Sequence, residues 1–282
     1  MKSNNFFCLL IIGFFFTACN NNSSSNANKS SDSLENANKN PSLKIDEVSY
    51  NADNTNLHAY VAYDDNIKGK RPGIIVVHEW WGMNDYPKMR ARKLAELGYV
   101  AMAVDLYGNG KTVDNDKDAG ALATPFYSDP EMTKRRLEVF ISNLKKYPEV
   151  DTTKMAAIGY CFGGGMVLNT ARLGENLAAV VSFHGSLIGT PARKDLLKSK
   201  ILVCHGMDDK FVSTEEVQKF KKQMDSIGAN YELKQYPNAT HAFTNPAATE
   251  TGKRLNMPIA YNPAADSASW NDMKKFFERV FK

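Results

Sequence analysis

The chain has 282 residues, of which 43% are hydrophobic and 23% are charged, and this composition fits one folded domain. The formal net charge is +4, and lysines and arginines form no long run. The charge pattern therefore argues against a nucleic-acid partner.

Residues 1–18 have the features of an export signal. Lys2 precedes an apolar run at residues 6–18, which ends in small residues directly before Cys19. Thirteen apolar residues span only ~20 Å as a helix, which is short of the ~30 Å hydrocarbon core of a bilayer. A cleaved secretory signal peptide therefore fits better than a membrane span.

The end of this segment resembles the lipobox of bacterial lipoproteins, with Phe16 where leucine is more usual. The resemblance implies that Cys19 carries a lipid anchor in a membrane and that the protein faces the periplasm or the cell exterior. A soluble secreted protein is the alternative. Residues 19–43 are mostly asparagine and serine and have little to bury. We therefore expect a disordered tether there, followed by a folded domain over residues 44–282.

Strands and helices alternate along this domain. Two alternating runs around the turn-forming NADNTN predict an antiparallel hairpin over residues 45–63. Continuous apolar runs predict buried strands, and apolar stripes with helical spacing predict helices. The predicted strands after the hairpin are 74–77, 100–108, 154–160, 177–183, 200–206 and 231–237, and the predicted helices are 84–99, 130–147, 166–172, 213–228 and 265–281. Two long segments read as loops, 108–129, a candidate rim of an active site, and 238–263.

This alternation implies a mostly parallel sheet with helices on both faces. The sequence GYCFGGG, residues 159–165, stands between a predicted strand and a predicted helix. A polar side chain framed by glycines at such a junction is the pattern of a nucleophile elbow. Together with the hairpin at the start, the elbow narrows the prediction to the α/β-hydrolase fold.

Cys161 takes the nucleophile position of this elbow. A thiol at a helix N-terminus has its pKa lowered toward the thiolate, which favours a working nucleophile. The alternative is a small buried side chain, the usual state of a free cysteine. An acid and a histidine should follow in chain order, and GMDDKFV and NATHAFT nominate Asp209 and His241. Asp208 stays open as the acid, although the spacing G-x-x-D-x-x-V favours Asp209.

The motifs VVHEWWGMND, AVDLYG, IGYCFGGG, HGMDDKFV and THAF together resemble the dienelactone hydrolase family. The resemblance implies a Cys–His–Asp triad that cleaves an ester or lactone through a thioester, without a metal or organic cofactor. It further implies that Glu79 holds the thiol neutral until substrate binds, and that the backbone N–H groups of Trp80 and Phe162 form the oxyanion hole. Tyr107 maps to a position near the substrate.

Trp81, together with Trp80, is predicted to form a wall of the substrate pocket because the two tryptophans follow a buried strand. His184 also follows a buried strand and is predicted either to line the pocket or to hydrogen-bond a neighbouring loop. Asn245 stands where the family has an arginine that binds the substrate carboxylate, and no arginine follows until Arg254. This departure argues against dienelactone itself as the substrate.

Cys161 and Cys204 invite the interpretation of a disulfide in an exported protein. The strand at 177–183 should lie between the strands that carry them, which puts them ~9–10 Å apart, beyond the ~7 Å limit. We expect both thiols to be free. The histidines lack the spacing of a metal site.

Two functions remain as alternatives to an esterase on this fold. One is a noncatalytic surface lipoprotein that binds a small ligand, and the other is a thioesterase or peptidase.

Overall fold

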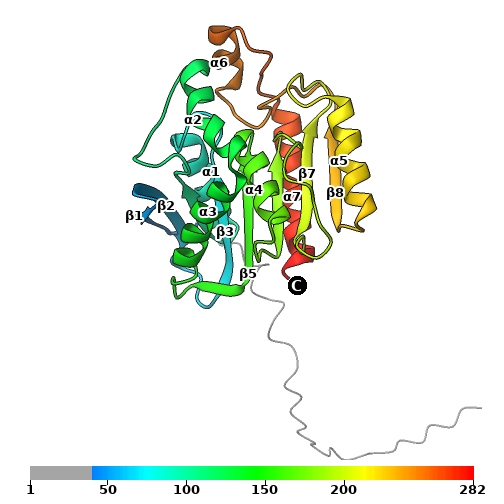
Figure 1. The fold of residues 1–282 in the computed structure, drawn as a ribbon. Coiled ribbons are helices and arrows are strands. Elements are labelled where there is room, and N and C mark those ends of the chain that lie inside the picture. Colours follow the sequence, from blue (N-terminus) through cyan, green and yellow to red (C-terminus); the bar gives the residue numbers. More distant parts are fainter. Residues whose placement is uncertain (1–39) are drawn as a thin grey trace, which may run out of the picture. The chain divides into compact units, whose positions relative to one another are not determined.

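The structure is a computed structural model that describes residues 40–282 (Figure 1). The predicted signal peptide, Cys19 and the tether up to residue 39 lie outside the described residues. The first strand begins at Leu43. Within residues 40–282, no helix combines the length and apolar character that a membrane crossing requires.

One mixed sheet organises the described residues. Its eight strands lie in the order β1-β2-β4-β3-β5-β6-β7-β8. β1 and β2 form the predicted antiparallel hairpin, β2 pairs antiparallel with β4, and every later pairing is parallel. The strands are β1 (Leu43–Ala52), β2 (Thr55–Asp64), β3 (Arg71–Val77), β4 (Val100–Val104), β5 (Val150–Tyr160), β6 (Ala179–Phe183), β7 (Lys200–Gly206) and β8 (Tyr231–Tyr236).

Helices cover both faces of this sheet, as Figure 1 shows. The helices are α1 (Asp85–Glu96), α2 (Asp116–Ser128), α3 (Pro130–Leu144), α4 (Phe162–Arg172), α5 (Thr214–Ser226), α6 (Ala248–Leu255) and α7 (Pro263–Val280). Side chains of α2, α3, α4 and α5 share one apolar cluster, and side chains of α1 and α7 share the other.

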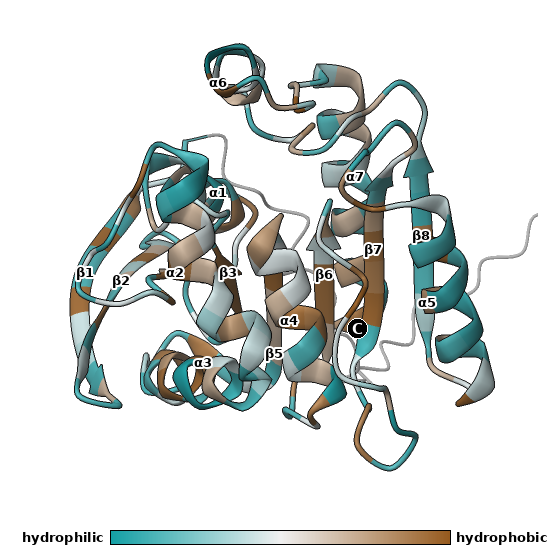
Figure 2. Ribbon diagram, turned by 45° about the horizontal axis from the view of Figure 1, so that its top comes forward, coloured by the Kyte–Doolittle hydropathy of each residue, from teal (hydrophilic) through white to brown (hydrophobic). Residues whose placement is uncertain are grey.

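The central strands are apolar on both faces because each face is covered by helices. In β3, Ile75 and Val77 join the first cluster, whereas Ile74 and Val76 join the second, following the two-residue period of a strand. Figure 2 shows β7 in the brown of hydrophobic residues and the edge strand β8 largely in the teal of hydrophilic ones. Because the strands from β4 and β3 through to β8 pair in parallel, their carboxyl ends lie at the same edge of the sheet.

The predicted loop over residues 108–129 contains a helix, α2, so that part of the prediction is wrong. Asn115 caps the helix by accepting a hydrogen bond from the N–H of Asp118. Only a narrow stripe is buried, at Ala119, Ala123 and Phe126. Because α2 also contains Gly120 and Pro125, which are typical of loops, its short apolar stripe did not distinguish it from a loop.

Other bounds also differ from the prediction. Strand β4 ends at Val104, four residues before the predicted end at residue 108, because residues 105–108 form a turn in which Asp105 accepts a hydrogen bond from the N–H of Gly108. Helix α6 lies within the predicted loop 238–263, where seven of its residues are polar, charged or small. Helix α4 begins at Phe162 rather than Met166, four residues earlier than its apolar pattern indicates. Glycine disfavours helices, so the three glycines at residues 163–165 concealed this first turn.

Candidate active site

The turn between β5 and α4 holds Cys161 in a strained conformation. Its φ is +53° and its ψ is −115°, a sparsely populated region for a residue other than glycine. The surrounding backbone is packed too closely for side chains. A Cβ on Gly163 would lie 2.5 Å from the carbonyl oxygen of Val77, and one on Gly159 would clash with the backbone of Gly163. The two glycines thus permit the sharp turn that projects the Cys161 side chain from the sheet edge.

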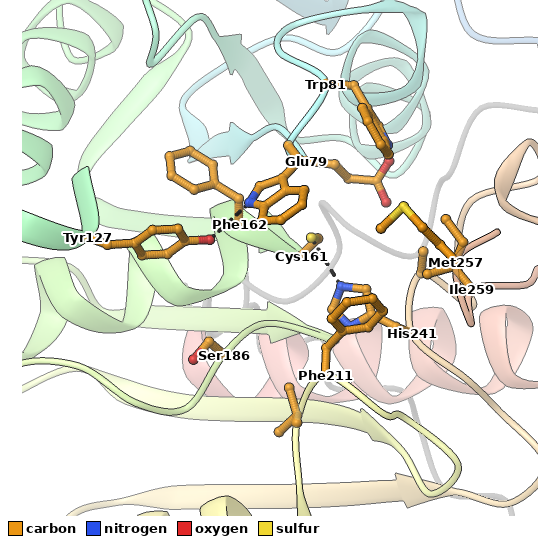
Figure 3. Close-up of a pocket in the computed structure, with 13 residues that line it drawn as sticks. Glu79, Trp81, Tyr127, Cys161, Phe162, Ser186, Phe211, His241, Met257 and Ile259 are labelled. Atoms are coloured by element: carbon orange, nitrogen blue, oxygen red, sulfur yellow. Dashed lines mark hydrogen bonds between the residues drawn. The ribbon is translucent and has the colours of Figure 1, made fainter. Parts of the chain in front are cut away.

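Three side chains from distant parts of the chain form a hydrogen-bonded series at this edge (Figure 3). The His241 Nε2 atom lies 3.1 Å from Cys161 Sγ, and its Nδ1 atom lies 2.8 Å from Asp209 Oδ2. Asp209 follows β7, and His241 lies in the loop after β8. Asp208 is exposed, whereas Asp209 is buried. The structure therefore brings Cys161 and His241 together with Asp209 rather than Asp208.

The acid in this series is itself fixed by backbone donors. Asp209 Oδ1 accepts hydrogen bonds from the N–H groups of Phe211 at 2.8 Å and Val212 at 3.2 Å. Burial alone would lower the pKa of His241, but the sulfur charge of Cys161 and the Asp209 carboxylate outweigh it and raise the pKa to about 10. This arrangement favours the protonated ring of His241 at neutral pH.

A cavity of about 230 Å³ opens beside the Cys161 sulfur. Trp80 and Trp81 border it from the turn after β3, and Tyr127 borders it from α2. The indole N–H of Trp80 donates a hydrogen bond to the Tyr127 hydroxyl at 3.1 Å, so α2 supports part of the wall. The other lining residues are Glu79, Cys161, Phe162, Ser186, Phe211, Val212, His241, Ala242, Met257 and Ile259.

Several of these lining residues were missed by sequence reasoning. Ser186, Phe211, Met257 and Ile259 come from loops, where no periodic pattern marks the buried side chains. Tyr127 lies on the helix that the sequence did not predict. The one signal available for it was the length of segment 108–129, which suggested an active-site rim.

Of Trp81, Tyr107 and His184, only Trp81 borders the cavity. Tyr107 is buried beneath the wall and donates a hydrogen bond to the backbone oxygen of Trp80 at 3.1 Å. His184 is also buried, and its Nδ1 atom accepts a hydrogen bond from the N–H of Cys161 at 3.1 Å. Neither side chain borders the cavity, and His184 makes a hydrogen bond to a neighbouring turn, which was the alternative prediction for it. The position of Tyr107 near the substrate stays a prediction.

The carboxyl group of Glu79 is buried at the cavity wall. Its Oε2 atom accepts a hydrogen bond from Asn245 Nδ2 at 2.5 Å, and Oε1 has no partner within residues 40–282. Burial raises the pKa of Glu79 to about 7. Glu79 makes no hydrogen bond to the Cys161 thiol. Its carboxyl group is hydrogen-bonded to Asn245, and the sulfur is hydrogen-bonded to His241.

The two residues predicted to supply oxyanion donors, Trp80 and Phe162, both border the cavity. Phe162 is the first residue of α4, so its N–H has no acceptor within the helix. The next amide along, that of Gly163, already donates to the carbonyl of His78 at 3.1 Å.

The remaining cysteine of the described residues lies apart from the site. Cys204 lies in β7, separated from β5 by β6, and both Cys161 and Cys204 are free thiols, as predicted. Within residues 40–282, no group of three or more potential ligands is arranged to hold a metal ion.

Residues 57–281 match the model of the dienelactone hydrolase family. The chain belongs to this family. Protein usf of Aquifex pyrophilus is 28% identical over 237 residues, which cover 82% of this chain and 96% of the relative. A relative from Aquifex aeolicus strain VF5, provisionally named a carboxymethylenebutenolidase, is 28% identical over 246 residues, which cover 83% of this chain and 98% of the relative.

Solved structures agree with this family assignment. A dienelactone hydrolase-like promiscuous phosphotriesterase from metagenomic libraries is 33% identical, with a TM-score of 0.79 over 84% of this chain and 98% of that one. The α/β-hydrolase fold predicted from the sequence is thereby confirmed. As a member of the dienelactone hydrolase family, the protein is a hydrolase of carboxylic ester or lactone bonds.

Proposed function

We propose that the protein cleaves its ester or lactone with Cys161 as nucleophile, His241 as proton carrier and Asp209 as the group that orients the imidazole. The observation that supports this proposal is the hydrogen-bonded series from Cys161 Sγ through His241 to Asp209. A nucleophile within reach of a base, which is in turn oriented by an acid, is the arrangement that nucleophilic catalysis requires.

In the first half-reaction the thiolate attacks the carbonyl carbon, and the carbonyl π electrons move to oxygen. The N–H groups of Trp80 and Phe162 would stabilise this oxyanion, each by ~3 kcal/mol, the value known for oxyanion-hole donors. The tetrahedral intermediate then expels the alkoxide, which takes the proton from His241 Nε2. A thioester on Cys161 remains.

In the second half-reaction water attacks the thioester carbonyl while His241 Nε2 removes one of its protons. Collapse of the second tetrahedral intermediate breaks the C–S bond, releases the carboxylic acid and restores the thiolate and the imidazolium. Asp209 keeps Nδ1 protonated throughout and stabilises the positive ring. The role predicted for Glu79, holding the thiol neutral before substrate binds, stays a prediction and needs a side-chain rotation from its contact with Asn245.

Hydrolysis of p-nitrophenyl acetate by the wild type, Cys161→Ala and Asp209→Asn tests this assignment. We expect Cys161→Ala to reduce kcat by at least ~1,000-fold, because the residual rate would come from binding and the oxyanion hole alone. Asp208→Asn is the matched control, since Asp208 is exposed and lies next to Asp209 in sequence. Equal losses in the two aspartate variants would contradict the role of Asp209.

The same experiment separates the alternatives. Activity in the wild type that Cys161→Ala retains would favour a different nucleophile, whereas no activity in either protein would favour the ligand-binding lipoprotein. A panel of acyl thioesters and short peptides discriminates an esterase from a thioesterase or a peptidase.

We also propose that this hydrolase acts from a membrane surface, tethered through a lipid on Cys19. The support is the sequence of residues 6–19, an apolar run that ends in small residues before the cysteine. Cells fed an alkyne-bearing fatty acid should label the wild-type protein and leave Cys19→Ser unlabelled. Label on both proteins, or on neither, would contradict the anchor.

A further inference from the structure

The cavity beside Cys161 presents no fixed positive charge to a ligand. Among residues 40–282, the residues that line it include neither lysine nor arginine. His241 is the one lining residue that can become cationic, and both of its ring nitrogens are already engaged, by Cys161 and Asp209. The Asp209 carboxylate is paired with that one cation at 2.8 Å, so the cation is not free to pair with a substrate anion.

The nearest arginines do not change this balance. Arg90 is 1% exposed, and its Nη2 atom donates to the carbonyl oxygen of Thr244 at 2.5 Å and to Asp266 Oδ1 at 2.6 Å. Its guanidinium group is paired with Asp266 and does not border the cavity. Arg254 is exposed on α6 and borders an adjoining cavity of about 180 Å³, which shares Trp81, Ala242 and Ile259 with the first and is also lined by Asp114.

Glu79 adds a second obstacle to an anionic ligand. Its buried carboxyl group borders the cavity, and Figure 3 shows it between Trp81 and Met257. Asn245 supplies one hydrogen-bond donor to Oε2, and Oε1 has none within the described residues. A substrate carboxylate placed here would meet this carboxyl group without a cation, and an unpaired buried carboxylate is strongly disfavoured.

The size and chemistry of the walls indicate what fits instead. A cavity of about 230 Å³ lies below the ~300–1,000 Å³ of pockets for drug-sized ligands. Trp80, Trp81, Tyr127 and Phe162 present aromatic surface to it. Such walls favour a small apolar or aromatic group.

We propose that this site selects uncharged esters or lactones with a small apolar or aromatic acyl group and discriminates against substrates that carry a carboxylate. This inference rests on the proposed function, because it concerns the substrate of the same cavity. The discrimination against a substrate carboxylate has two causes: no lysine or arginine borders the cavity among the described residues, and Glu79 is paired with Asn245.

Two esters that differ at one end of the acyl group, a methyl ester against a free carboxylate, test the proposal. Phenyl methyl succinate is neutral, and phenyl hydrogen succinate carries a carboxylate at the same position. We expect kcat/KM for phenol release to be about 100-fold higher for the neutral ester, because the anion loses its hydration and gains no partner. Equal values, or a preference for the anion, would overturn the proposal.

Binding to Cys161→Ala tests the same preference without turnover. Two of the three tryptophans of the chain, Trp80 and Trp81, border the cavity, so ligand entry should change the intrinsic fluorescence. We expect Kd for the neutral ester to be at least ~10-fold lower than for the anion. A binding preference without turnover in the wild type would sustain this proposal and contradict the proposed function. Equal binding, or tighter binding of the anion, would overturn this proposal even if both esters are hydrolysed.

Two variants locate the origin of the preference. Asn245→Arg places a cation beside Glu79. We expect it to reduce the ratio of kcat/KM between the neutral and the anionic ester by at least ~10-fold. Arg254→Gln is the control and should leave that ratio unchanged. A selective loss of the anionic ester in Arg254→Gln would show that the neighbouring cavity captures anions and would overturn the proposal. If circular dichroism shows that Asn245→Arg does not fold, the ratio of kcat/KM between the two esters in the wild type and in Arg254→Gln still tests the proposal.

Discussion

The backbone N–H of Cys161 donates a hydrogen bond to Nδ1 of His184 at 3.1 Å, so the strained turn is held by a histidine that does not face the substrate cavity. Because Nδ1 accepts, the ring proton is on Nε2, which lies 2.7 Å from Thr244 Oγ1. Burial lowers the pKa of His184 well below its ordinary value, so the ring stays neutral. Behind it, the Thr244 hydroxyl lies 2.6 Å from the hydroxyl of Tyr86.

Replacement of Thr244 by valine should destabilise the protein through this network. The Nε2–H of His184 would lose its acceptor while it remains buried, which costs ~1–3 kcal/mol. Urea unfolding measures the loss as a lower midpoint with an unchanged slope. Thr124→Val is the control, because Thr124 is exposed on α2 and bonds only within its helix. Equal stability of the two variants would contradict the role of Thr244.

Glu79 should make the stability of the protein depend on pH. Burial raises its pKa from 4.5 to about 7, so the folded state binds this proton more tightly than the unfolded state. Its contribution is fully present below pH ~4.5 and is lost as the pH rises through about 7, by ~3 kcal/mol in total. The stability of Glu79→Gln relative to the wild type should therefore increase between pH 5 and pH 8. A constant difference in urea midpoints would contradict the raised pKa.

Tyr127 should limit the length of the acyl chain. Its ring borders the cavity and lies edge-on to Phe162, with the ring centroids 5.8 Å apart. Removal of the ring in Tyr127→Ala should raise kcat/KM for p-nitrophenyl octanoate relative to the acetate by about 10-fold, since several methylene groups gain buried contact. Tyr127→Phe keeps the ring and should retain the wild-type preference. Relaxed chain-length preference in Tyr127→Phe alone would contradict this steric role.

The two cysteines of the folded domain should differ sharply in reactivity. Cys161 borders the cavity beside His241, whereas Cys204 is fully buried and burial raises its pKa to about 12. Brief treatment of the native protein with iodoacetamide should therefore alkylate Cys161 and spare Cys204, because the thiolate is the reacting form. Peptide mapping by mass spectrometry reads the outcome. Faster labelling of Cys204 would contradict the arrangement.

The sequence was most informative where physical constraints are local and strong. Apolar runs predicted the parallel strands, and the glycine frame around Cys161 predicted the sharp turn. Helix α2 was not predicted because only three of its residues are buried. Tyr127, which lies on this helix and borders the cavity, was therefore not predicted either.

The contacts between side chains of distant loops could not be predicted from any pattern in the chain. Glu79 and Asn245 are separated by 166 positions, and only the folded sheet brings them together. His184 follows a buried strand as a pocket residue would, yet its ring turns back to the Cys161 amide. Position at a strand end thus predicted which residues gather at the site, but not which way they point.

The most direct test is mass spectrometry of enzyme quenched in acid during turnover of a slow ester. We predict an added acyl group on the peptide that contains Cys161, labile to hydroxylamine as a thioester is, and its absence in Cys161→Ala. An acyl group on another residue, with turnover retained in Cys161→Ala, would rule out Cys161 as the nucleophile.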